Sequence, residues 1–168
     1  MKLEPFSQLL LRIFDVPIFF YQSNYDLNPS KVLPISSNLD LKAFLQVKEN
    51  DPKEIKVSML LQTLEKGKSA LDFTALCTAF FYSEIPFPTE SKELTKEQKR
   101  ILLTALSATF STFRGFLLCK LPIGIDHPET GDPKNIIPLV PLDKLLDALE
   151  EGNDEVIDSL QNTERKEQ

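Results

Sequence analysis

Apolar residues in this chain recur mostly at intervals of three and four, which is the spacing of one face of an α-helix. The longest such stretch runs from Ile101 to Phe113 and carries no charged side chain on any side. It is shorter than the roughly 20 apolar residues that cross a bilayer, so we expect other parts of the protein, or a partner, to surround it. Thr95 and Gln98 form a capping-box pattern that predicts the start of this helix, and Gly115 predicts its end.

Five further segments show the same helical spacing, and they begin at Glu4, Ser36 to Asn38, Asp51, Ser69 and Pro141. Capping residues or prolines at their first positions strengthen these predictions. Proline breaks the pattern after the first segment and allows a small β-hairpin within residues 18–35. The sequence therefore predicts a mainly α fold, a single-domain helical bundle around a central apolar helix at about 95–115. Residues 1–161 are expected to form this domain, and residues 162–168 a disordered acidic tail.

The net charge of −6 lies in the C-terminal part of the chain. Residues 1–142 hold 16 acidic and 16 basic side chains, whereas residues 143–168 hold 9 acidic and 3 basic ones. A neutral body with an acidic end does not attract phosphates, so no nucleic-acid partner is expected. We expect another protein as the partner, with a basic surface that faces the acidic segment. The alternative is that this segment only aids solubility.

Candidate catalytic chemistry is confined to one polar cluster. His127, the only histidine, lies beside Asp126, Glu129 and Asp132, and Arg114 is the cation that adjoins the uncharged helix. An imidazole oriented by a carboxylate can act as a general base, but no nucleophile motif accompanies it. The cluster does not fit a calcium loop or a zinc site, and the sequence holds no phosphate-binding glycine loop. The sequence therefore predicts no metal and no cofactor.

The cysteines and the N-terminus bear on location. Cys77 and Cys119 fall in apolar segments and are expected to be reduced and buried. The N-terminus lacks the charged region and continuous apolar run of a secretory signal, because Glu4 and Arg12 interrupt it. We therefore expect a cytoplasmic protein with no membrane insertion.

Two aromatic stretches bounded by proline are the candidate partner-binding segments, with Phe19, Phe20 and Tyr21 in one and Phe87 in the other. A ring on a rigid backbone can anchor a partner at modest entropic cost, unless both stretches pack inward over the central helix. We hypothesise an intracellular protein-binding module, an adaptor, chaperone-like protein or regulatory subunit, with no chemistry of its own. The alternatives are a small helical enzyme with a site around His127 and an obligate structural subunit of a larger assembly.

Overall fold

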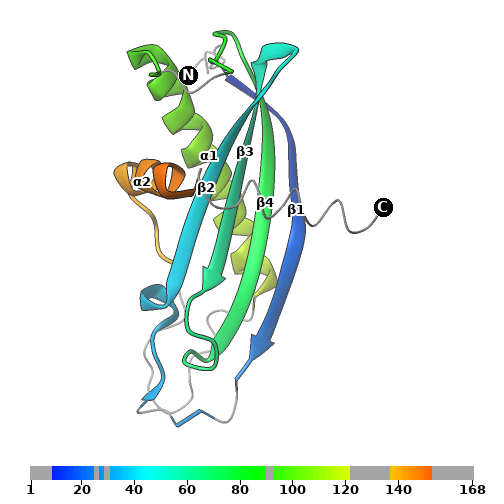
Figure 1. Ribbon diagram of the computed structural model, residues 1–168. Helices are drawn as coiled ribbons and strands as arrows, with labels where there is room; N and C mark the ends of the chain where they lie inside the picture. Colours follow the sequence, from blue (N-terminus) through cyan, green and yellow to red (C-terminus); the bar gives the residue numbers. More distant parts are fainter. Residues whose placement is uncertain (1–8, 25–26, 29–30, 90–92, 122–136, 153–168) are drawn as a thin grey trace, which may run out of the picture.

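The computed structural model describes residues 9–24, 27–28, 31–89, 93–121 and 137–152. These residues form a four-stranded antiparallel β-sheet with two α-helices on one of its faces (Figure 1). The elements are β1 (Leu9–Ser23), a 3₁₀ turn η2 (Ile35–Ser37), β2 (Leu39–Lys48), β3 (Asp51–Thr63), β4 (Leu71–Ser83), α1 (Lys96–Lys120) and α2 (Leu142–Gly152). The order across the sheet is β1-β4-β3-β2. The predicted helical bundle is therefore wrong.

The four segments predicted as helices before residue 95 are strands because their side chains alternate between two faces. In β3 the buried residues Ile55, Val57, Met59 and Leu61 are separated by residues on the opposite face. β4 shows the same period of two from Leu71 to Ser83. The helical prediction failed because apolar residues also occur on the second face, for example Leu60, and they create intervals of three and four.

The hairpin predicted within residues 18–35 is also absent from the described residues. Residues 18–23 belong to β1, which pairs with β4 and not with the segment that follows it. Pro17, predicted to end a helix, lies instead inside β1 at a register shift between Asp15 and Ile18. A proline is tolerated there because β1 is an edge strand and a bulge does not need every backbone donor.

The core lies between the helices and the sheet face that carries small residues at its centre. Ala43, Ala75, Cys77 and Ala79 are fully buried on this face, so a helix can approach the sheet closely. α1 fills the space with large side chains that are also buried, namely Ile101, Leu102, Leu106, Phe110, Phe113 and Leu117. α2 lies against β2 and buries Leu145, Ala148 and Leu149. One helical layer therefore covers one face of the sheet.

The start of α1 is confirmed. The Thr95 hydroxyl accepts a hydrogen bond from the Gln98 backbone N–H at 3.2 Å, and the Gln98 side chain accepts one from the Thr95 N–H at 2.8 Å. The predicted end at Gly115 is wrong, since the helix continues to Lys120. At 25 residues α1 is long and apolar enough to cross a membrane by length and composition alone, and here its buried face packs on the sheet.

A buried polar cluster fixes the end of the sheet where β3 turns into β4. The Asn38 side chain donates to the Glu65 carbonyl at 3.0 Å and to the Ser69 hydroxyl at 2.9 Å, and it accepts from the Glu65 N–H at 2.9 Å. Gly67 in the same turn has a φ of 75°, which favours glycine. Its N–H donates to the Asp72 carboxylate at 2.7 Å. Asn38 thus ties the start of β2 to the β3–β4 turn.

Replacing Asn38 with alanine should lower the free energy of unfolding by about 1–3 kcal/mol, because the buried Ser69 hydroxyl and the partly buried Glu65 backbone groups lose their partner. Urea denaturation of wild-type and N38A chains would measure the difference. Asn50→Ala in the exposed β2–β3 turn is the matched control and should change stability by less than about 0.5 kcal/mol. Equal losses in the two variants would contradict the structural role of Asn38.

The two cysteines differ in their surroundings, contrary to the prediction that both are buried. Cys77 is fully buried on β4, and this burial raises the pKa of its thiol to about 12. Cys119 is exposed near the end of α1. Because thiolates are the reactive form, the two side chains should react at very different rates.

At pH 8 a thiol reagent such as Ellman's reagent should modify Cys119 in the native protein and Cys77 only after unfolding. The raised pKa also predicts a pH dependence: the unfolded thiol ionises near its ordinary value while the folded one stays protonated, so stability falls as pH rises from about 9 towards 12. Counting modified thiols with and without urea tests the first statement. Fast modification of both thiols in the native state would contradict it.

Candidate functional site

The sheet face opposite the helices, the open face, is the most distinctive surface of the described structure. No helix of the described residues covers it, and α1 and α2 both lie on the other side (Figure 1). The register identifies its residues, since cross-strand partners point to the same face. This face divides into an apolar part on β1 and β4 and a charged part that extends across β3 to β2.

The apolar part, here called the apolar stripe, consists of Leu10, Ile13, Ile18 and Phe20 on β1 together with Phe80 on β4. Ile13 pairs with Phe80, and Ile18 pairs with Leu76, so the stripe spans both strands. Ile13 and Phe20 keep 58% and 54% of their surfaces exposed. Single exposed apolar residues are ordinary, but a row of them on one strand is typical of an interaction surface.

The stripe lies beside an open sheet edge. β1 is the outermost strand, and within the described residues no strand pairs with its outer side. Such an edge presents unpaired backbone donors and acceptors that another extended chain can use. Apolar side chains and free backbone groups therefore occur together on β1.

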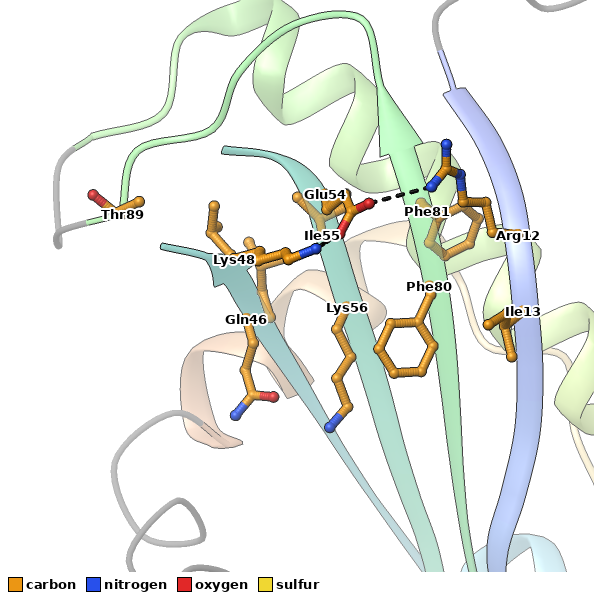
Figure 2. Close-up of a pocket in the computed structure, with 12 residues that line it drawn as sticks. Arg12, Ile13, Gln46, Lys48, Glu54, Ile55, Lys56, Phe80, Phe81 and Thr89 are labelled. Atoms are coloured by element: carbon orange, nitrogen blue, oxygen red, sulfur yellow. Dashed lines mark hydrogen bonds and ion pairs between the residues drawn. The ribbon is translucent and has the colours of Figure 1, made fainter. Parts of the chain in front are cut away.

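The charged part borders a hollow of about 650 Å³ on the open face, here called the basic groove (Figure 2). Arg12, Lys48 and Lys56 supply three cations to its lining, and Glu54 is the single anion. Glu54 accepts from Arg12 Nη1 at 3.2 Å and from Lys48 Nζ, so it is held between two cations. The groove therefore carries an excess of positive charge in a protein whose net charge is −6.

Aromatic rings support the cations of the basic groove. The Arg12 guanidinium lies 5.1 Å from the centroid of the Tyr82 ring, and the Lys56 ammonium lies 5.7 Å from that of Phe80. Such contacts hold the alkyl stems against the sheet while the charged ends stay in solvent. Figure 2 shows Lys56 and Phe80 side by side at the groove, with Ile13 on the neighbouring strand.

The outer face of α1 is a second surface, without charge between Ile101 and Phe113, and the other described residues do not surround this stretch. Ser111, Thr112 and Gly115 are exposed there. The hydroxyls of Thr104 and Thr112 donate to the carbonyls of Arg100 and Ala108, at 3.0 and 2.9 Å. The helix thus uses these donors internally, and this face offers few polar groups to a ligand.

The predicted partner-binding residues are dispersed. Phe20 and Tyr21 are exposed on β1, on opposite faces of the sheet. Phe19 is half-buried, and its ring packs edge-on against Phe116 of α1 with centroids 5.3 Å apart. Phe87 is only 2% exposed and belongs to the core, which leaves it no surface for a partner.

The alternative polar site is not assembled in the described structure. Asp126, His127, Glu129 and Asp132 lie outside the described residues. Arg114 donates from Nε to the Ile137 carbonyl at 2.9 Å, so it holds the segment before α2 against α1. Among the described residues no group of three or more histidine, cysteine, aspartate or glutamate side chains could hold a metal ion.

Sequence reasoning missed Ile13, Arg12, Lys48 and Lys56. These residues come from three strands that were predicted as separate helices, so nothing suggested that they share a face. Alternation along residues 54–62 was the available signal, since it places Lys56 opposite the buried Ile55 and Val57.

Comparison with known proteins gives a likeness of fold alone. No family model matches the chain. No curated protein matches it either. Matching solved structures include a SecB-like chaperone of Mycobacterium tuberculosis, solved with a ChAD peptide from the HigA1 antitoxin, at 13% identity and a TM-score of 0.44, covering 79% of this chain and 91% of that one. A protein of unknown function from Streptococcus agalactiae matches at 13% identity and a TM-score of 0.35, covering 68% and 90%. Likenesses this weak assign neither family nor function.

The apolar stripe should bind the dye anilinonaphthalene sulfonate in the native state, because the dye fluoresces on exposed apolar surface. Ile13→Ser and Phe20→Ser together should lower the fluorescence by at least about half, with little change in stability because both side chains are largely exposed. Leu139→Ser is the control, since Leu139 is 77% exposed but precedes α2. A drop of the same size in the control would show that the dye does not report on the stripe.

Proposed function

We propose that this chain is a protein-binding module that captures an extended segment of another polypeptide along β1. The captured segment adds a strand to the sheet through its backbone, and its apolar side chains lie on the apolar stripe. A chaperone-like or adaptor role fits such binding, because backbone hydrogen bonds accept many sequences and the stripe selects only for apolar character.

The observation that carries this proposal is the coincidence of an open edge and exposed apolar side chains on one strand. An open edge alone can pair with the backbone of any extended chain, and an apolar patch alone binds a ligand in no fixed orientation. On β1 the two occur together, since the exposed apolar residues from Leu10 to Phe20 belong to the edge strand itself. The proposal is drawn from this surface and not from the weakly similar chaperone.

The charge of the open face adds a preference among segments. Arg12 adjoins Ile13 on β1, and Lys56 contacts Phe80 at the same end of the stripe. A segment that combines apolar residues with acidic flanks would therefore associate faster than one with basic flanks. This preference should weaken with salt, since the cations are exposed and screened.

A set of short apolar peptides labelled with a fluorophore tests the proposal by anisotropy titration. Ile13→Ser and Phe20→Ser should each lower the affinity for the tightest-binding peptide about tenfold or more, because burial of such a side chain contributes roughly 1.5–3 kcal/mol. Leu139→Ser should leave the affinity unchanged.

A second form of the same peptide distinguishes strand addition from purely apolar contact. Methylating alternate backbone nitrogens of the peptide removes its donors on one edge but keeps every side chain, so strand addition predicts a large loss of affinity. Equal affinity of the two peptides would contradict strand addition. Analytical ultracentrifugation of the chain without peptide provides the remaining test: a stable dimer that Ile13→Ser dissociates would show that β1 serves self-association.

A further inference from the structure

We infer that the acidic C-terminal segment of this chain, residues 154–160, docks into the basic groove of its own sheet and competes there with bound polypeptides. The docking itself follows from the groove and the segment. Only the competition rests on the proposed function.

Charge complementarity is the first argument. Residues 154–160 read Asp-Glu-Val-Ile-Asp-Ser-Leu and hold three carboxylates and no cation. The basic groove offers three cations, and two of them already share Glu54. Within the described part of the chain Lys56 contacts the Phe80 ring and forms no ion pair, so an incoming carboxylate can pair with it directly.

The apolar residues of the segment supply the second argument. Val156, Ile157 and Leu160 lie among the carboxylates, and in an extended conformation Asp154, Val156, Asp158 and Leu160 share one face. In the groove, Ile13 and Phe80 lie beside the cations and are both exposed. An extended segment can therefore place carboxylates on the cations and aliphatic side chains on the stripe. A purely acidic tail without aliphatic residues would use only half of this surface.

Chain length permits the contact. The segment follows directly after α2, which ends at Gly152 and lies against β2 on the helical side of the sheet. An extended chain spans about 3.3 Å per residue, so Asp154 can lie up to about 7 Å from Gly152 and Leu160 up to about 26 Å. α2 packs on β2, the edge strand that carries Gln46 and Lys48, so the segment has only to pass around this edge to reach the open face. Attachment to the same chain raises its effective concentration to about the millimolar range, where weak ion pairs suffice.

Paramagnetic relaxation in the full-length chain tests the docking without any added partner. A nitroxide is attached at Ser159→Cys in a Cys119→Ser background, with the buried Cys77 left in place. We expect broadening of the amide signals of Gln46, Lys48, Lys56 and Phe80, and none on the outer face of α1. High salt should remove it. Broadening confined to other faces, or none at low salt, would overturn the proposal.

Matched variants identify the contacts. Lys48→Gln with Lys56→Gln should abolish the broadening, whereas Lys96→Gln with Lys99→Gln on α1 should leave it unchanged. A mixed sample serves as the intermolecular control: one set of chains carries the nitroxide but no isotope, and the other carries the isotope but no nitroxide. Docking within one chain predicts no broadening in this sample. Broadening in that mixture would mean that the segment docks on a second copy, which also overturns the proposal.

Competition is measured separately, with the fluorescent apolar peptide. Neutralising the segment by Asp154→Asn, Glu155→Gln and Asp158→Asn should increase the affinity for the peptide at least threefold. Unchanged affinity, with intact broadening in the wild-type chain, would refute the competition and leave the docking. Failure of every variant to bind the peptide would refute the proposed function and leave the docking equally intact.

Discussion

The structure depends on one constraint: a single layer of helices can cover only one face of a sheet. Small side chains at the centre of the covered face, such as Ala75 and Ala79, let α1 lie close to β3 and β4. The large side chains of α1 then fill the core, and α2 closes it over β2. Most of the favourable free energy of folding comes from this contact, because apolar burial is concentrated there. The apolar stripe and the basic groove both lie on the face left open.

The open face is uneven, and this unevenness gives it its chemical character. Towards β1 it is apolar and ends at a free edge, while towards β2 it becomes cationic around Glu54. Ile13 and Phe80 lie where the two parts meet. A ligand that is only apolar or only acidic uses part of this surface. Because the acidic charge is separated into the C-terminal residues, one chain carries a cationic sheet surface and an anionic C-terminal part.

The sequence correctly predicted where the two helices begin but wrongly predicted the strands as further helices, for a physical reason that particular residues show. Thr95 with Gln98, and Pro141 before Leu142, are local signals that depend on a few neighbouring residues, and both helices begin where those signals stand. The strands have no comparable local signal. Phe44, Leu60 and Leu76 lie on the open face, while their neighbours in the sequence lie on the covered face. Because these three residues are also apolar, the sequence does not alternate between apolar and polar residues, which is the pattern that identifies a strand. The candidate site could not be found, because strand pairing between distant residues creates it. Local composition made Phe19, Phe20, Tyr21 and Phe87 candidate partner-binding residues, but it could not show that Phe20 and Tyr21 are exposed and Phe87 is buried.

The interruptions in β1 have a consequence for solubility. A strand laid along this edge must follow the hydrogen-bonding register of β1, and that register shifts between Leu11 and Ile13 and again around Pro17. The longest uninterrupted stretch is Ile18 to Ser23. The edge can therefore pair with a short bound segment but not with a long continuous strand. This disfavours the stacking of many copies into fibrils. An edge strand with which no other described strand pairs gains in this way a built-in limit on aggregation.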